Sequence, residues 1–187
     1  PSALPQNFHL IHWQDMTSYV PLLKNSFLLA GGASFAALLV VLAWSYAVPF
    51  SNFTNRWLLG CIFMPFFIPQ VSFLLGMQIS LSRVGLDGTW LALMWVHMIF
   101  ILPYTWLIVV PARRALDHRL DHLAATLGAS GWKRFFTLHM PLMAYSLGTA
   151  LFIGIAVSMS LYLPTIFVGA GRINTITVEA VSLASGG

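Results

Sequence analysis

The stretch ALLVVLAWSYAV, residues 37–48, contains no charged side chain and lies inside an uncharged run that extends from Lys24 to Arg56. That run encloses 31 residues, whereas a helix needs only about 20 apolar residues to cross a hydrocarbon core about 30 Å thick. Three further uncharged runs enclose 26, 25 and 37 residues, between Arg56 and Arg83, Asp87 and Arg113, and Arg134 and Arg172. We therefore predict four membrane spans, at residues 25–48, 57–81, 90–110 and 142–164.

The overall composition excludes an ordinary soluble domain. Hydrophobic residues make up 58% of the chain and charged residues 7%, and the mean hydropathy is +0.82, whereas a typical soluble domain has about 25% charged residues. A transmembrane barrel would show alternating segments of about ten residues rather than unbroken apolar runs. The sequence thus predicts an all-α fold, a polytopic transmembrane helical bundle that forms one domain over residues 1–187.

The charged residues between the spans are divided unequally. One side of the predicted topology carries six basic residues against two acidic ones, a net charge of +4, and the other side carries three of each. Since Lys and Arg are retained on the cytoplasmic side, we predict that residues 112–141 form a cytoplasmic loop and that residues 1–24 and 165–187 are periplasmic segments. The same rule explains the basic excess without a nucleic-acid partner, and no basic face interleaved with aromatic residues points to one.

From Ala115 the predicted cytoplasmic loop has the pattern of a short amphipathic helix. Gly128 follows where the end of a helix favours a residue with positive φ. A stripe of leucines held between two membrane-anchored ends is typical of a docking surface for a partner protein. The alternative is that the stripe lies on the protein's own membrane helices or on lipid headgroups. Four leucines, spaced by four, three and four residues, form this stripe: Leu116, Leu120, Leu123 and Leu127.

A second polar element begins near Ser130. It carries aromatic and cationic residues of the kind found at a membrane interface: Trp132, Lys133, Arg134, Phe135 and Phe136. Pro141 follows, and we predict that it starts the path back into the bilayer because a proline suits the first turn of a helix.

The spacing within this loop resembles a known motif. Gly128 is followed by nine residues and then by LHMP, residues 138–141, similar to the cytoplasmic loop of ABC-importer permeases, which reads EAA, three residues, Gly, nine residues, Ile-x-Leu-Pro. Aligning on Gly128 places the EAA triplet over His122, Leu123 and Ala124. The resemblance covers about residues 23–185. It looks most like the iron(III), thiamine and spermidine type of the MetI-like superfamily, in which many members are two fused halves.

The resemblance implies a multi-pass permease of the bacterial inner (plasma) membrane. Its partners would be ATP-binding cassette ATPase subunits, a second permease half, a periplasmic solute-binding protein and membrane lipid. A final membrane helix of the family would be missing from residues 1–187. The chain itself lacks the GxxxxGK[ST] phosphate loop, so we expect no cofactor and no ATP hydrolysis by this chain. The residues expected to couple to the ATPase are Leu116, Leu120, Asp121, His122, Leu123, Ala124, Leu127, Gly128 and Pro141.

The chain departs from the motif at His122, where the family usually has the Glu that meets the ATPase. Asp121 is one candidate to replace that carboxylate, although a shift of one residue turns a helical side chain by about 100°. A divalent metal held by His118 and His122, with Asp117 and Asp121 at a parallel spacing, is a further interpretation of the same helix, but no third or fourth ligand is evident.

Four residues inside the spans are candidates for the pathway. His97 falls in mid-span, where ionisable groups are costly and face a bundle interior or a cavity; it either bonds a neighbouring helix or contacts the substrate. Pro65, Pro69 and Pro103 interrupt the second and third spans and serve either a gate or simple packing kinks. A different class of function, an ATP-independent channel or proton-coupled carrier that uses His97, would be expected to have carboxylates inside the spans, and these spans contain none.

Overall fold

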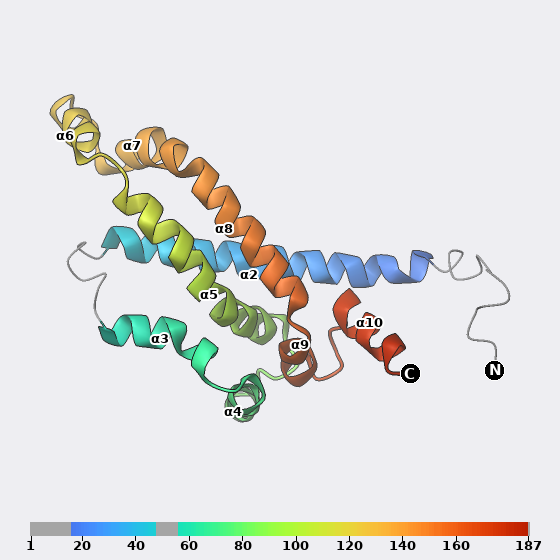
Figure 1. Cartoon of the computed structure of the whole chain (residues 1–187). Helices are drawn as coiled ribbons and strands as arrows, with labels where there is room; N and C mark the ends of the chain where they lie inside the picture. The colour runs from blue at the N-terminus through green and yellow to red at the C-terminus, as the bar shows by residue number, and fades with distance from the viewer. Residues whose placement is uncertain (1–15, 48–55, 187) are drawn as a thin grey trace, which may run out of the picture.

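The structure, a computed structural model, describes residues 16–47 and 56–186, and within these ranges all regular structure is helical (Figure 1). The all-α prediction is therefore confirmed. Predictions for residues 1–15 and for Val48 lie outside the described residues. In chain order the elements are α2 (Met16–Ala47), α3 (Arg56–Phe67), α4 (Gln70–Arg83), α5 (Trp90–Arg114), α6 (His118–Thr126), α7 (Gly131–Arg134), the π-helical turn η2 (Phe135–His139), α8 (Met140–Ser160), α9 (Tyr162–Gly169) and α10 (Ile176–Ala184).

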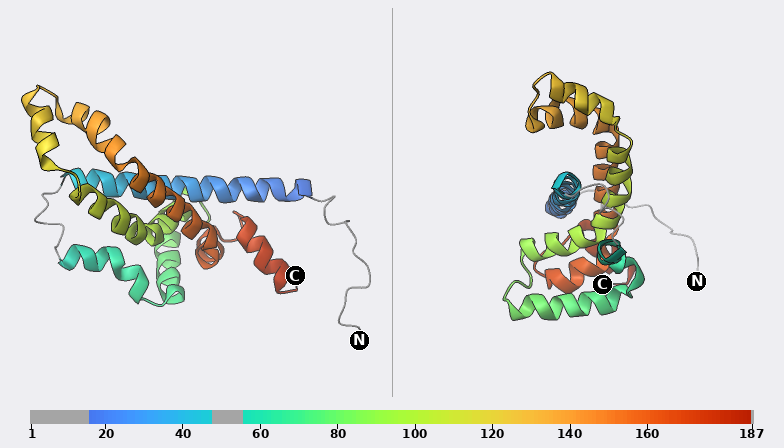
Figure 2. Two further views of the ribbon diagram at one scale, coloured as in Figure 1. Left: turned by 45° about the horizontal axis from the view of Figure 1, so that its top comes forward. Right: turned by 90° about the vertical axis from the view of Figure 1, so that its left-hand side faces the viewer.

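The centre of the molecule is the packing of α2, α5 and α8, and α2 crosses the other two in the left view of Figure 2. One buried cluster joins these three helices around Val41, Val109 and Leu147. A second joins α4, α5 and α9, with Leu74 and Leu93 at its centre. Because lipid is as apolar as these side chains, close van der Waals packing rather than the hydrophobic effect holds such helices together.

Three helices of the described chain are long and apolar enough to cross a membrane, or four if the bent pair α3 and α4 counts as one span. The second predicted span, residues 57–81, is interrupted, because α3 and α4 lie at 108° to each other. Pro69 has no N–H to donate, and the residue before a proline is disfavoured in the helical conformation. The first helix therefore ends at Phe67, and Pro69 precedes the first residue of the second.

Pro65 and Pro103 were also predicted to interrupt their helices, and this prediction is wrong. The described structure has α3 running through Pro65 and α5 running through Pro103 without a break, and both side chains are buried. Two helices extend beyond the predicted spans: α2 begins at Met16, before Asn25, and α5 continues to Arg114. Apolar content locates the part of a helix that suits lipid, whereas the ends depend on capping and backbone conformation.

The helix that contains most of the fourth predicted span, residues 142–164, has different ends from that span. Helical structure is continuous from Gly131 to Ser160, and a separate helix, α9, begins at Tyr162. Pro141 lies in the first turn of α8, inside this continuous segment. The predicted periplasmic segment from residue 165 is also largely helical, since it contains the rest of α9 and all of α10.

Two contacts close the end of the bundle that lies away from α6. Gly88, in the turn before α5, donates its N–H to the carbonyl of Val168 in α9 (2.9 Å). Asn25, in α2, donates its side-chain amide to the carbonyl of Asn174, ahead of α10 (3.2 Å). The start of α2, the α4–α5 turn and the last two helices therefore form one end of the molecule, and α6 and α7 form the other (Figure 1).

Candidate functional site

The short helix α6 has defined caps at both ends. Asp117 accepts a hydrogen bond from the N–H of Arg119 (2.8 Å) and caps the first turn. At the other end Gly128 has φ +78° and donates to the carbonyl of Ala125, while Ala129 donates to Ala124, which is the paired bonding of a Schellman motif. The prediction that the helix stops at Gly128 is confirmed, and Gly is required there because other residues rarely adopt this φ.

Three of the four leucines of the predicted stripe are exposed on α6 and its C-cap. Their exposed fractions are 43% for Leu120, 59% for Leu123 and 87% for Leu127. Leu116 does not belong with them: it precedes α6, is half-buried and packs against the cluster between α2, α5 and α8. The predicted helix start at Ala115 is therefore wrong, because α5 occupies the chain to Arg114 and α6 begins only after Asp117.

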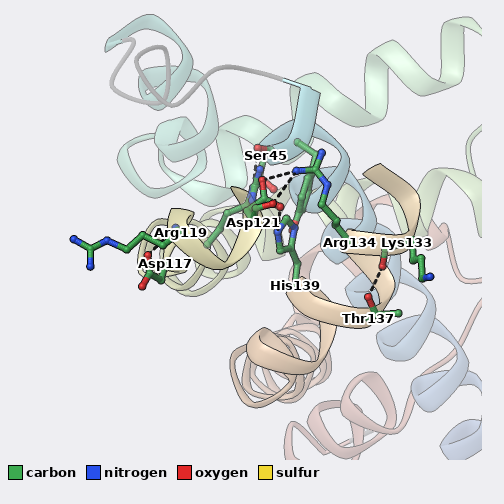
Figure 3. Close-up of polar contacts among 10 residues, drawn as sticks. Ser45, Asp117, Arg119, Asp121, Lys133, Arg134, Thr137 and His139 are labelled. Atoms are coloured by element: carbon green, nitrogen blue, oxygen red, sulfur yellow. Dashed lines mark hydrogen bonds and ion pairs between the residues drawn. The ribbon is translucent and has the colours of Figure 1, made fainter. Parts of the chain in front are cut away.

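The other residues that were predicted to couple to the ATPase differ in exposure and position. The side chain of His122 is exposed and that of Ala124 is half-buried. The side chain of Asp121 points the other way, toward the body of the protein, as Figure 3 shows. Pro141 is exposed in α8 rather than on α6.

Asp121 connects α6 to the segment that leads into α8. Its Oδ2 accepts from Nη1 of Arg134 (2.8 Å), and its Oδ1 accepts from Nε2 of His139 (3.0 Å). Nη1 of Arg134 also lies 3.4 Å from the carbonyl oxygen of Asp121. A hydrogen bond accepted by an ionised carboxylate is roughly twice as strong as a neutral one, so this pair of contacts fixes the base of the helix.

The same contacts continue to the ends of α2 and α5. Nδ1 of His139 lies 2.8 Å from the hydroxyl of Tyr46 in α2, and the two rings are stacked. The guanidinium of Arg113, in α5, lies 3.5 Å from the centre of the Tyr46 ring and donates Nε–H to the carbonyl of Ser45 (3.1 Å). We call Asp121, Arg134, His139, Tyr46 and Arg113 the α6 clasp.

The π-helical turn η2 places His139 in the clasp. In this turn Met140 donates its N–H to the carbonyl of Phe135, five residues earlier. Pro141 follows, and in a regular α-helix its ring would clash with the carbonyl one turn before it. A wider turn directly ahead of Pro141 accommodates the ring, and its last residue, His139, is buried.

His97 lies in the middle of α5 and is 1% exposed. Its Nδ1 lies 2.8 Å from the hydroxyl of Ser158 in α8, and its Nε2 lies 3.2 Å from the hydroxyl of Thr165 in α9. The hydroxyl of Thr165 donates to the carbonyl of Leu161 (3.0 Å), so it can only accept from His97. The imidazole therefore carries its proton on Nε2 and accepts from Ser158 at Nδ1. The predicted bond to a neighbouring helix is confirmed, across the break between α8 and α9.

The other predicted pathway residues are divided among three helices. Pro65 lies in α3 and Pro69 at the start of α4, whereas Pro103 follows His97 by six residues along α5. A role for these residues in a pathway stays a prediction. Among residues 16–47 and 56–186, no group of three or more His, Cys, Asp or Glu side chains is placed to hold a metal ion.

Most residues of the clasp could not be predicted from the sequence. Tyr46 and Arg113 lie at the ends of two apolar runs, and nothing in their spacing pairs them with Asp121. From its sequence context Arg134 was predicted to lie at the membrane interface. The one available signal was His139, which falls within the interval between Gly128 and Pro141 that the resemblance singled out.

At this end of the molecule a short helix projects beyond the ends of two membrane helices, with exposed leucines on its outer face and a charged base. The chain belongs to the family of binding-protein-dependent transport system inner membrane components, which its sequence matches over residues 39–183. It is a multi-pass protein of the inner membrane.

Individual relatives agree with this family. The chain is 37% identical, over 88% of its length, to the inner membrane ABC transporter permease protein YnjC of Escherichia coli, of which it covers 31%. It is 30% identical, over 78% of its length, to the molybdenum transport system permease protein ModB of Haemophilus influenzae, of which it covers 70%. It is 26% identical, over 72% of its length, to the putative 2-aminoethylphosphonate transport system permease protein PhnV of Salmonella typhimurium, of which it covers 51%.

The chain spans about a third of the Escherichia coli relative and about half of the Salmonella one. Membership of the family and location in the membrane are therefore stated for residues 1–187. The resemblance to ABC-importer permeases is confirmed, whereas the narrower iron(III), thiamine and spermidine type stays a prediction.

Proposed function

We propose that this chain is the permease subunit, or part of the permease, of an ATP-driven ABC importer, and that α6 is the element through which a separate ATPase drives it. The observation that carries the proposal is the outward face of α6, where Leu120, Leu123 and Leu127 are exposed although the helix is tied to the bundle at its base. Three leucines exposed to water on one short helix are typical of a helix that lies in the groove of a partner.

The end of the molecule at α6 is, in this proposal, the cytoplasmic end. It carries Arg113, Arg114, Arg119, Lys133 and Arg134, and such residues are retained on the cytoplasmic side of a membrane. The relatives' names refer to different solutes, molybdenum and 2-aminoethylphosphonate, so the proposal does not choose a solute. A periplasmic solute-binding protein and a second permease half complete the proposed assembly.

The proposal is tested by purifying the full-length permease from its native membrane with a tag and identifying the proteins that remain bound. We expect an ATP-binding cassette subunit in the eluate and, in liposomes, uptake that requires ATP. Solute flux through the purified permease alone, without ATP or a bound ATPase, would instead support a channel or carrier and end the importer proposal.

The orientation gives a second expected result. Lys133 is exposed at the tip of the α6 end, so a membrane-impermeant amine reagent should modify it in inverted vesicles and not in intact cells. Modification is read by mass spectrometry of the peptide that contains Lys133. Lys24, exposed near the opposite end of α2, is the control and should show the reverse pattern. Labelling of Lys133 from outside would contradict the proposed cytoplasmic position of α6.

A further inference from the structure

The helix α6 has almost no apolar attachment to the rest of the bundle. Within the part of the chain that the structure describes, no residue of α6 is buried, and its leucines face outward. A helix of nine residues is too short to be stable by itself in water. The contacts that Asp121 makes at its base therefore help to hold it in position, together with its two connections along the chain.

Those contacts join four segments that are far apart in the sequence. Asp121 belongs to α6, Arg134 and His139 to the helix that continues into α8, Tyr46 to the last turn of α2, and Arg113 to the last turn of α5. Figure 3 shows Asp121 directed at Arg134 and His139, while Asp117 and Arg119 on the same helix point away from them. The carboxylate of Asp121 is thus the point at which α6 meets the membrane helices.

The direction of the hydrogen bonds makes the clasp a continuous chain. Asp121 is an acceptor, so Nε2 of His139 donates to it. In a neutral imidazole Nδ1 then accepts, and the hydroxyl of Tyr46 donates to it. Tyr46 is held in turn between the His139 ring and the Arg113 guanidinium. A displacement of Asp121 is therefore passed to α2 as well as to α8.

We propose that Asp121 is a positioning residue of the coupling loop: it fastens α6 to the start of α8 through Arg134 and His139, and to the end of α2 through His139 and Tyr46, so that the three helices move as one unit. The inference rests on the proposed function, since it assigns to α6 the role of receiving motion from an ATPase. It gives Asp121 an inward role, distinct from a contact with the ATPase itself.

The test uses the full-length permease assembled with its ATPase, in lipid nanodiscs. Spin labels are attached to cysteines at Ala125 on α6 and Ala43 on α2, both exposed, in a chain with Cys61→Ser. The distance between the labels is measured without nucleotide and with ATP and orthovanadate. In the otherwise unmodified chain we expect one distance in both conditions, because α6 carries α2 with it.

In Asp121→Asn we expect a second distance that appears only with ATP and orthovanadate. Its population should rise at least about tenfold over the unmodified chain, because one charge-assisted hydrogen bond corresponds to such a factor or more in an equilibrium constant. A merely loosened structure would broaden the distances in both conditions. Tyr46→Phe removes only the hydroxyl and leaves Asp121 and Arg134 paired, so it should give the same nucleotide-dependent second distance with a smaller population.

The matched control is Asp117→Asn, the same substitution on the same helix. Asn caps a helix about as well as Asp, and Asp117 points away from the clasp, so a single distance is expected. A single distance in Asp121→Asn with the ATPase still bound would overturn the inference and leave the proposed function standing. Loss of the ATPase from Asp121→Asn alone would make Asp121 a docking contact and also overturn it. If the unmodified chain binds no ATPase, the proposed function fails first, and the inference fails with it.

Discussion

Replacing both Leu123 and Leu127 with aspartate should abolish retention of the ATPase by the purified permease. In the proposed complex these side chains, 59% and 87% exposed in the free chain, enter a groove of the partner. Burying an unpaired carboxylate there costs several kcal/mol, and about 3 kcal/mol is already a factor of about 100 in affinity. The measurement is the ratio of ATPase to permease after affinity purification, together with ATP hydrolysis by the assembled complex.

The control for this prediction is Ala125→Asp. Ala125 is exposed on α6, but its position is turned well away from Leu123 and Leu127 around the helix, so it adds one aspartate to the same helix outside the apolar face. We expect it to retain the ATPase. If the double aspartate variant inserted into the membrane and bound the ATPase as well as the unmodified chain does, the leucines would not be a docking surface. The remaining reading of the stripe would then be contact with lipid headgroups.

Replacing Gly154 with leucine should prevent stable packing of the bundle. A Cβ atom at Gly154 would lie 2.9 Å from the Oγ of Ser34 in α2 and 3.0 Å from a methyl carbon of Ile101 in α5. Glycine at this position lets α8 approach both helices closely. Overpacking a well-packed core typically costs 1–3 kcal/mol, and the rigid neighbours place this site at about 3 kcal/mol. For a chain of this size that is a fall of about 6–12 °C in the midpoint of thermal unfolding, measured on purified protein in detergent.

Gly148→Leu is the matched control, since it makes the same change on the same helix. An added Cβ at Gly148 meets no atom within 4 Å, and glycine costs a helix about 1 kcal/mol relative to a better helix former. The unfolding midpoint of this variant should stay within a few degrees or rise. Equal losses of stability in the two variants would show that close approach at Gly154 does not hold α2, α5 and α8 together.

The sequence was a good guide to α6 because local rules govern that helix. Gly128 sits at positive φ where the spacing predicts a helix end, and Asp117 caps the first turn. The sequence was a poorer guide to Leu116, which has the right spacing for the stripe but precedes the helix. The leucine spacing does not show where α5 ends and α6 begins. The residues between these two helices include no glycine or proline that would mark the turn in the sequence.

The second span shows a similar limit. Pro65, Pro69 and Pro103 all lie in apolar runs, yet only Pro69 coincides with a break, and the two helices there lie at 108°. In lipid a proline is tolerated when neighbouring helices satisfy the backbone groups that it frees. Which proline bends the chain therefore depends on the packing around it, and this information is absent from the local sequence.

The amino-acid sequence by itself determined that this is a helical membrane protein, because runs of 25 to 37 uncharged residues leave lipid as their only suitable solvent, and it located the polar helix that interrupts them. The tertiary structure alone decided which way that helix faces. Asp121 turns inward because Arg134, His139, Tyr46 and Arg113 meet there from three other segments, and contacts between distant parts of a chain arise only when the helices pack. The hydrogen bonds of His97 with Ser158 and Thr165 depend on the packing of the helices for the same reason.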